Sequence, residues 1–203
     1  MEDLWLMTTA HIAKFSGGEI HITTGGSEPT APNGKILYKT SADGEWLQSN
    51  ALITNGTFNG FSEKNNAVSV IIPSKDANGN DVTSIGDNAF SGCDKMTNVI
   101  IPDGVTSIGS SAFSGSYRLT SVTIPNSVTS IGSRAFFSCS MPMTIPSSVT
   151  SIGVAAFGGI QTITIDKTVA QTQAMTPSPS TWNASSYTPL TVICTDGSFT
   201  IAG

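Results

Sequence analysis

The stretch Val128-Thr129-Ser130-Ile131-Gly132 decides the fold, because the same five residues occur four times in the chain. The copies span residues 82–86, 105–109, 128–132 and 149–153, so successive copies lie 23, 23 and 21 residues apart. A fixed period of this length is typical of a solenoid, in which each unit forms one coil and hides its apolar side against the next. The sequence therefore predicts a stack of coils in the middle of the chain, with a shortened third unit.

Each unit contains further positions that recur in register. Ala-Phe follows the five-residue motif, and a short segment with alternating apolar residues, such as 122–124, follows the Phe and ends at a Pro. The alternation predicts a strand, and the Pro ends its hydrogen-bond ladder. The predicted buried core consists of the repeated Phe and the Ile of each motif: Phe90, Phe113, Phe136, Phe157, Ile85, Ile108, Ile131 and Ile152.

Two local expectations concern the turns and the start of the array. We expect the residues between motif and Phe to form a helical turn or a piece of 3₁₀ helix, and the motif Gly to supply a backbone angle that the turn requires. The segment 70–73 lies twelve residues after Phe61, the same interval as from Phe90 to Pro102. The array therefore begins with a degenerate half-unit near residue 53.

The units resemble the BspA-like leucine-rich repeat, also called the Treponema pallidum type, with the pattern L-x-x-I-x-[LI]-P-x-x-[VL]-x-x-I-G-x-x-A-F-x-x-C. Residues 82–166 carry the Pro, Ile-Gly, Ala-Phe and Cys positions together, whereas the opening Leu is present only as Leu119. The resemblance implies a mostly β leucine-rich-repeat solenoid of 23-residue coils with short helical or 3₁₀ turns, flanked by β-hairpin caps. It also implies a relation to bacterial cell-surface adhesins and host-binding proteins.

The segments outside the array do not repeat. Three hairpins are predicted: around Gly17-Gly18, around Asp43-Gly44, and over residues 190–201. Residues 168–188 are expected to form a short helical or irregular piece and a loop. We predict a module, anchor or cap at 1–52, the solenoid at 53–166, and a C-terminal cap at 167–203, because the ends of a repeat array need polar covers.

Composition excludes several classes of partner. The 203 residues carry a net charge of −5 with only nine Lys and Arg, which leaves no basic surface for nucleic acid. No apolar run reaches the ~18 residues of a membrane span, so membrane insertion is not expected. The chain starts with Met1-Glu2-Asp3 where a leader would be basic and then apolar, so we expect the mature protein to start at Met1.

The residues that could carry chemistry are few. Cys93 and Cys139 hold the same coil position two units apart, about 10 Å at ~4.8 Å per coil, which is too far for a disulfide. We expect both to be small buried thiols and Cys194 to be free. His11 and His21 match no zinc or catalytic pattern.

A string of oxygen-bearing residues at 76–87 is similar to a calcium loop, but Asp81 stands where that loop has Gly, so we expect a solvated Asn-Gly turn. Asn55 and Asn183 begin glycosylation sequons that would matter only in a eukaryotic secretory protein. The sequence thus predicts no catalytic residue, no metal site and no cofactor.

The surface left for recognition is the outward face of the strands before each Pro. Its candidate residues are Ser69, Ile71, Asn98, Ile100, Ser121, Thr123, Thr144, Thr162 and Thr164. They form a nearly uncharged face of small residues with an apolar patch at its N-terminal end, although Ser and Thr also occupy exposed strands through β-propensity alone. A second Thr row, at 83, 106, 129 and 150, lacks the paired files that an ice-binding surface needs.

These features predict a non-enzymatic recognition or attachment module on an exterior surface, on a virion or outside the cell. The expected partners are a protein or carbohydrate on a cell surface, or neighbouring virion subunits, with a homo-oligomer through the N-terminal region. The absence of a visible leader favours a phage decoration, fibre or tail protein over a bacterial adhesin. The remaining alternative is a purely structural assembly subunit that uses the coils as a rigid spacer.

Overall fold

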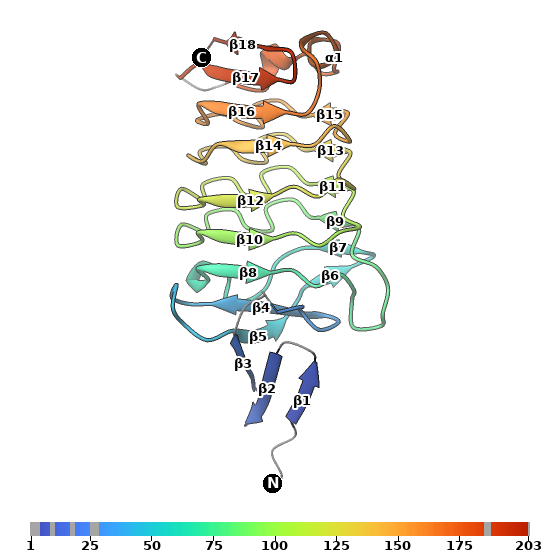
Figure 1. Cartoon of the computed structure of the whole chain (residues 1–203), viewed down its shortest axis with the longest axis vertical. Coiled ribbons are helices and arrows are strands. Elements are labelled where there is room, and N and C mark those ends of the chain that lie inside the picture. The colour runs from blue at the N-terminus through green and yellow to red at the C-terminus, as the bar shows by residue number, and fades with distance from the viewer. Residues whose placement is uncertain (1–4, 9–10, 17–18, 25–28, 185–187, 203) are drawn as a thin grey trace.

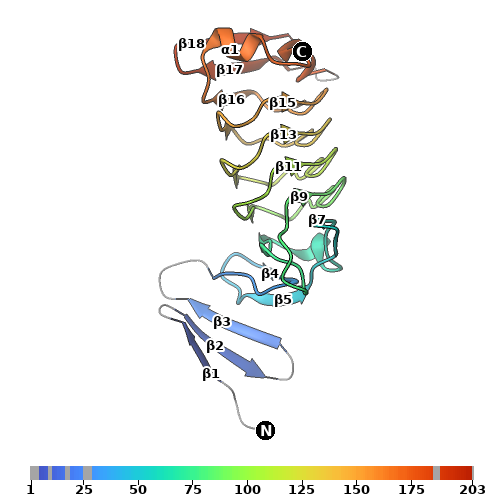
Figure 2. The ribbon, with the colours of Figure 1, turned by 90° about the vertical axis from the view of Figure 1, so that its right-hand side faces the viewer.

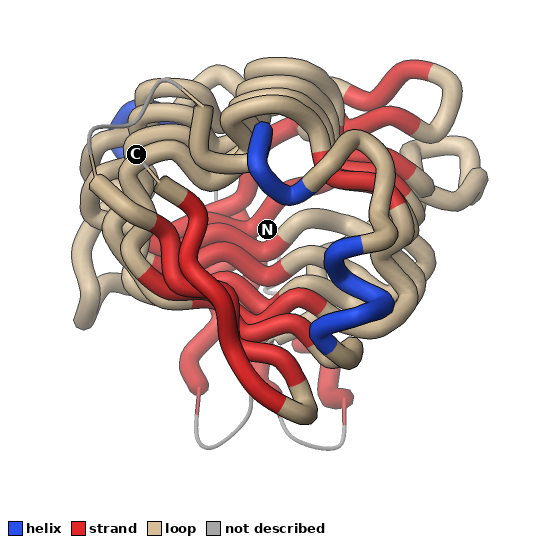
Figure 3. Tube along the Cα trace, turned by 90° about the horizontal axis from the view of Figure 1, so that it is seen from above, coloured by secondary structure: helices blue, strands red, loops and turns tan. Residues whose placement is uncertain are grey.

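The computed structural model describes residues 5–8, 11–16, 19–24, 29–184 and 188–202, with side chains from residue 29 onward. Its coils are stacked along the longest axis of the molecule, with the N-terminus at one end and the C-terminus at the other (Figure 1). Seen along this axis, successive coils superpose and enclose a common interior (Figure 3). The predicted solenoid of repeats about 23 residues long is confirmed.

The strands that precede each Pro lie side by side on one surface, here called the strand face (Figure 1). Together with strands from the two ends of the chain, they form a five-stranded sheet, in the order β12-β10-β8-β4-β5, and a four-stranded sheet, in the order β14-β16-β17-β18. The strands of the first sheet are β4 (Lys35–Lys39), β5 (Leu47–Asn50), β8 (Ser69–Ile71), β10 (Asn98–Ile100) and β12 (Ser121–Thr123). Those of the second are β14 (Met143–Ile145), β16 (Thr162–Ile165), β17 (Leu190–Cys194) and β18 (Gly197–Ile201).

The five-residue motifs form a second, continuous sheet, here called the motif sheet. Its order is β15-β13-β11-β9-β7-β6. The strands are β6 (Ile53–Thr54), β7 (Thr57–Phe58), β9 (Ser84–Ile85), β11 (Ser107–Ile108), β13 (Ser130–Ile131) and β15 (Ser151–Ile152). From β9 to β15 the strands are parallel, and each Ser and each Ile pairs with its equivalent in the next coil. An identical motif in every unit therefore gives an identical register in every coil.

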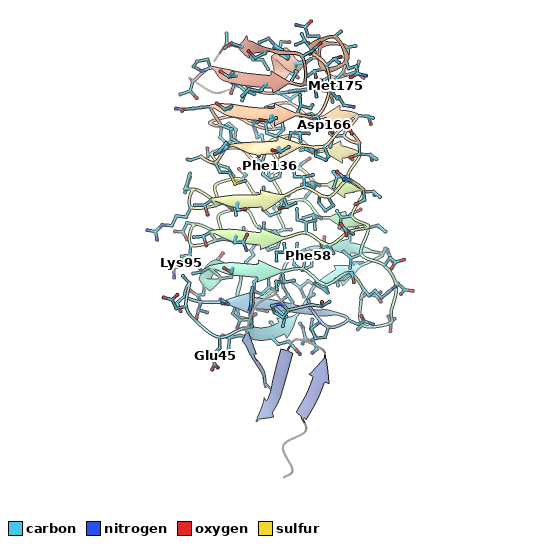
Figure 4. The ribbon with its side chains drawn as sticks, viewed as in Figure 1. Glu45, Phe58, Lys95, Phe136, Asp166 and Met175 are labelled. Atoms are coloured by element: carbon cyan, nitrogen blue, oxygen red, sulfur yellow. The ribbon has the colours of Figure 1, made fainter. Side chains whose placement is uncertain are left out.

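The repeated Phe rings form a column inside the stack. Adjacent rings of Phe90, Phe113 and Phe136 are nearly parallel, with centroids 5.1 and 5.2 Å apart, and Phe157 continues the column at 6.3 Å. All eight predicted core residues are at most 2% exposed. Figure 4 shows Phe136 in the interior of the coils. All eight belong to one hydrophobic core cluster.

The first ring of the column is Phe58, whose centroid lies 5.3 Å from that of Phe90. Phe61, the residue that the spacing indicated, instead packs against Tyr38 at 5.4 Å. The spacing was misleading because the half-unit before the first complete coil is built from a hairpin, β6–β7, and this hairpin places Phe58 beneath Phe90.

The motif Gly does not have the role that the sequence indicated. A Cβ atom on Gly132 would lie 2.6 Å from the backbone carbon of Gly109, and one on Gly109 would lie 2.7 Å from that of Gly86. Neither Gly109 nor Gly132 has a positive φ. The Gly is therefore required because backbones of adjacent coils approach each other closely there.

The positive φ of each turn falls two residues after the Gly. Four residues that are not Gly have φ between 54° and 57°: Asn88, Ser111, Arg134 and Ala155. These residues lie within a series of turns, in each of which a backbone amide donates to the carbonyl three residues earlier. Examples are the Ser114 amide to the Ser111 carbonyl and the Ser116 amide to the Phe113 carbonyl. The segment is thus a chain of short turns, with no continuous helix in the described coils.

The N-terminal end of the stack is closed by antiparallel elements. β4 pairs with β8 of the array and with β5, so hydrogen bonding crosses the boundary predicted after residue 52. Beyond β5 lies an antiparallel sheet of β1 (Trp5–Thr8), β2 (His11–Ser16) and β3 (Glu19–Thr24), with β3 next to β5 (Figure 2). A short 3₁₀ turn, η1 (Lys64–Asn66), precedes β8.

The C-terminal end is closed by the segment after β16. It contains α1 (Val169–Gln173), the 3₁₀ turn η2 (Pro179–Thr181) and the hairpin β17–β18. Trp182 ends the aromatic column, edge-on to Phe157 at 6.2 Å, and its carbonyl accepts a hydrogen bond from the Phe157 amide. The three predicted hairpins and the short helical piece are all present.

Candidate functional site

The exposure of the strand face changes along the stack. Ser121, Thr123, Thr144 and Thr164 are exposed, whereas Ser69, Asn98, Ile100 and Thr162 are half-buried. β10 and β12 place Asn98 beside Ser121 and Ile100 beside Thr123, and β14 and β16 place Thr144 beside Thr164. The structure therefore brings the predicted residues onto one face, with the open part over β12, β14 and β16.

Ile71 is a correction to the predicted face, because its side chain is only 4% exposed. It packs in a separate cluster with Ala31, Leu37 and Trp46, and Ile100 packs against the edge of this cluster. The expected apolar patch at the N-terminal end of the face is therefore covered by the chain's own N-terminal segment. The pattern of a single repeat cannot reveal this cover, because the covering residues lie 25 to 40 positions earlier in the chain.

A groove of about 640 Å³ lies on the open part of the strand face. It is lined by Ser121, Thr123, Thr144 and Thr164, four of the predicted residues, and by apolar side chains that include Val122 and Pro146. This is a volume in which a small ligand or part of a chain ligand can be held. Asp166 is the only charged residue that lines this groove.

The strand face continues beyond the repeats, which sequence reasoning missed. β17 pairs in parallel with β16, so Thr191 lies beside Thr162 and the exposed Ile193 beside Thr164. The hairpin 190–201 was expected only as a cap. The alternating pattern of Leu190-Thr-Val-Ile-Cys194 indicated a strand. It could not indicate that this strand pairs in parallel with β16, because 24 residues separate β16 from β17.

The second Thr row is exposed but its hydroxyls are engaged. The Oγ1 atoms of Thr106, Thr129 and Thr150 donate to the carbonyls of Thr83, Thr106 and Thr129 in the preceding coil, at 3.1 to 3.2 Å. This row therefore links neighbouring coils. Its hydroxyl donors are not directed to a ligand.

The cysteines are free and buried, as expected. Cys139 donates through Sγ to the Phe113 carbonyl, as Ser116 does through Oγ to the Phe90 carbonyl in the preceding coil. Burial raises the pKa of the Cys93 thiol to about 11 and that of Cys139 to about 12. Both thiols stay protonated near neutral pH and are poor nucleophiles.

The calcium-like string forms the expected turn. The Asp76 carboxylate accepts hydrogen bonds from the amides of Asn78 and Asn80 and from the Asn80 side chain, and these bonds lower its pKa. An ion pair of 2.7 Å between Lys75 and Asp81 closes the base of the turn. Both oxygens of the Asp76 carboxylate and one of the Asp81 carboxylate thus hold the turn together.

Other candidate positions add no chemistry. His11 and His21 lie on β2 and β3, at positions whose side chains fall outside the described residues. Across the described part of the chain, no group of three or more His, Cys, Asp and Glu could hold a metal ion. Of the two sequons, Asn55 is exposed in the β6–β7 turn, and the buried Asn183 donates through its side-chain amide to the carbonyls of Thr188 and Ala202. None of the helices in the described residues is long and apolar enough to cross a membrane.

Parallel strands stacked coil upon coil over a column of Phe rings define a leucine-rich-repeat solenoid. Residues 53–176 match the BspA type leucine rich repeat region in six copies. The chain belongs to this family, as the resemblance in the sequence predicted. Among curated proteins, none matches the chain significantly.

Solved structures with a similar fold come from several bacteria. A leucine-rich repeat protein from Bacteroides ovatus is 25% identical, with a TM-score of 0.48, over 80% of this chain and 42% of its own length. The T. pallidum leucine-rich repeat protein is 21% identical, with a TM-score of 0.45, over 57% of this chain and 68% of that one. One from Bacteroides capillosus is 26% identical, with a TM-score of 0.46, over 59% of this chain and 93% of that one. The chain thus spans less than half of the Bacteroides ovatus protein.

Proposed function

We propose that this protein is a non-enzymatic recognition or attachment module displayed on an exterior surface. The observation that carries the proposal is the open part of the strand face, where Ser and Thr side chains from successive coils surround a groove. Stacked coils hold these side chains at fixed intervals, and a rigid array of this kind suits binding to an extended surface. The thiols of Cys93 and Cys139 are buried inside the coils, and no group of His, Cys, Asp and Glu among the described residues could hold a catalytic metal ion.

The geometry of the ends supports attachment. The three-stranded sheet β1–β3 forms a separate layer at one end, and the strand face opens toward the other end (Figure 2). The N-terminal region is therefore proposed as the anchor, either in a homo-oligomer or on a neighbouring subunit. A virion-associated decoration, fibre or tail protein would use this arrangement, and so would a bacterial cell-surface adhesin. Immunogold labelling of the producing cells and of the particles released on lysis distinguishes the two carriers.

Charge placed on the strand face tests the proposal. A Thr123→Glu/Thr164→Glu variant puts two carboxylates at the groove, and a matched Ser74→Glu/Ser133→Glu variant puts two on exposed positions elsewhere. Labelled protein is measured by flow cytometry on a panel of bacterial and epithelial cells. We expect saturable adherence that only the first variant loses, while both variants keep the unfolding midpoint of the native protein.

The structural alternative predicts a different result. If the coils are only a spacer, the first variant adheres as the native protein does, and oligomer mass is the property that changes when the N-terminal sheet is altered. Light scattering of the native protein and of a variant altered in the sheet β1–β3, across a range of concentrations, gives this mass. Adherence that does not depend on Thr123 and Thr164, or no saturable adherence at all, would contradict the recognition proposal.

A further inference from the structure

The strand face is interrupted at one place, between β12 and β14. These two strands are the ends of two separate sheets, although the motif sheet behind them runs on without a break from β11 through β13 to β15. Pro125 follows Phe113 by twelve residues, but Pro146 follows Phe136 by only ten. Pro142 also stands where the coil before it has Ser121, and Pro has no amide hydrogen to donate to a neighbouring strand. The shortened unit thus breaks the ladder on one side of the solenoid only.

The shortened unit also has one residue fewer in the turn before its strand than the preceding unit has. Two residues, Tyr117 and Arg118, lie between the buried Ser116 and Leu119, whereas a single residue, Ser140, lies between the buried Cys139 and Met141. A second hollow of about 530 Å³ is lined by residues of both turns, Tyr117, Arg118 and Ser140, and it shares Thr120 and Pro142 with the 640 Å³ groove. The two hollows are therefore contiguous and cross the interrupted part of the strand face.

The chemistry of this composite groove is hydroxyl-rich and almost uncharged. Its two charged lining residues, Arg118 and Asp166, belong to different hollows, and no Lys or Glu lines either one. The lining also includes the hydroxyls of Thr123 and Thr144 and the apolar carbons of Val122 and Pro142. Tyr117, which lines the smaller hollow, is 63% exposed, so its ring is available for stacking.

We propose that the composite groove binds a neutral polysaccharide chain. This inference rests on the proposed recognition function and deepens it. A sugar ring has hydroxyls around its edge and apolar C–H groups on its faces, which match a lining of both hydroxyl and apolar groups. A lining with one acidic and one basic residue has no net charge, so it does not attract a polyanion or a polycation electrostatically. Tyr117 stacks on a ring at one end of the chain.

The geometry favours this ligand over an extended peptide. A peptide strand inserted between β12 and β14 would have to hold them at about twice the ~4.8 Å strand spacing. β13 pairs with both β11 and β15 on the opposite side, and this pairing keeps the coils at a single spacing. A sugar hydroxyl needs no such opening, because it can reach the two strand edges from the surface.

The test uses the full chain, labelled with ¹⁵N, and three neutral probes: cellohexaose, laminarihexaose and mannohexaose. A polygalacturonate hexamer serves as the anionic control. We expect at least one neutral probe to shift amide resonances of residues 120–124 and 143–145 at millimolar concentration, and the anionic probe to shift none of them. Tyr117→Ala and Thr144→Val should each weaken binding about fivefold or more, the effect of one lost contact of about 1 kcal/mol.

Thr83→Val is the matched control, because it makes the same chemical change at an exposed Thr outside the composite groove. It should leave the affinity unchanged. The inference is overturned if no neutral probe shifts these resonances, if Tyr117→Ala and Thr144→Val bind as tightly as Thr83→Val, or if the anionic probe binds equally well.

Failure of this inference is distinguishable from failure of the proposed function. Adherence to cells that depends on Thr123 and Thr164, survives periodate oxidation of the cell surface and is abolished by protease treatment would make the ligand a protein. The recognition function would then stand and the polysaccharide would be excluded. Adherence that is lost on periodate treatment and is competed by the neutral probe supports both.

Discussion

The motif sheet and the strand face are built by the same coils, yet only one of them is regular. In the motif sheet, Ser130 and Ile131 pair with their equivalents on both sides, and the order of strands is unbroken from β6 to β15. On the strand face, the segment between Phe and Pro changes in length and composition, and the sheet is divided between β12 and β14.

The difference shows how this solenoid separates stability from recognition. The motif sheet, its Thr ladder and the aromatic column form one regular half, in which each coil repeats the contacts of the last. That regularity keeps the coils in register even where the strand face is interrupted. The strand face can therefore vary, and variation there produces the groove.

The largest expected effect comes from removing residues 167–203. This deletion would expose the ring of Phe157 and the edge of β16, because Trp182 covers the first and β17 pairs with the second. Exposed apolar surface and an open strand edge promote association. We expect a rise in mass with concentration by light scattering, whereas Trp182→Ala in the full chain should destabilise the protein without association. A stable, monodisperse truncated chain would contradict the assignment of this segment as a cap.

The aromatic column gives the next largest effect. Phe113→Ala would open a cavity between two stacked rings and should lower the free energy of unfolding by about 3–5 kcal/mol. Phe137→Ala, at a half-buried ring outside the column, is the control and should cost clearly less. Denaturant unfolding measures both, and a loss below about 1 kcal/mol for Phe113→Ala would mean that the column does not hold the coils together.

The close approach of coils in the motif sheet predicts an intermediate effect. In Gly132→Ala, the new Cβ atom would meet the backbone of Gly109 at 2.6 Å, and backbone cannot move aside as a flexible side chain can. We expect a loss of about 1–3 kcal/mol, in the range of overpacked sites. Ser133→Ala, at the exposed neighbouring position, should change stability by less than about 0.5 kcal/mol. Equal unfolding midpoints for the two variants would show that the approach is not tight.

The smallest effect is expected at Cys139. Cys139→Ser should change stability by no more than about 1 kcal/mol near neutral pH, since Ser116 makes the equivalent hydrogen bond one coil earlier. The two proteins should differ at high pH. The thiol pKa rises from 9.0 to about 12 on burial, so above pH 9 the unfolded state releases a proton that the folded state retains.

The native protein should therefore lose stability between pH 9 and pH 12 more steeply than Cys139→Ser, and the two should run in parallel below pH 9. Urea unfolding at a series of pH values gives the comparison. Parallel curves up to pH 11 would indicate that the thiol is accessible to water in the folded state.

Much of the fold could be predicted because it repeats along the chain. Local patterns within a single unit or turn were enough to predict several features. These are the 23-residue period, the buried Phe and Ile positions, and the hairpins at Gly17-Gly18 and Asp43-Gly44. Alternation along a strand also assigns Thr123 and Thr144 to the outside, and both side chains are exposed in the structure. The reason is that a solenoid makes nearly all its contacts between equivalent positions of neighbouring units.

Only the tertiary structure decided the contacts between segments that are not equivalent repeats. Trp46 covers Ile71, Phe58 takes the place in the column that spacing gave to Phe61, and the hairpin after the array extends the strand face in parallel. The motif Gly serves close packing, and no single unit contains the neighbour that it packs against. The groove likewise exists only because a short coil is held at the normal spacing by the regular sheet behind it, and this balance depends on contacts between coils that no stretch of sequence contains.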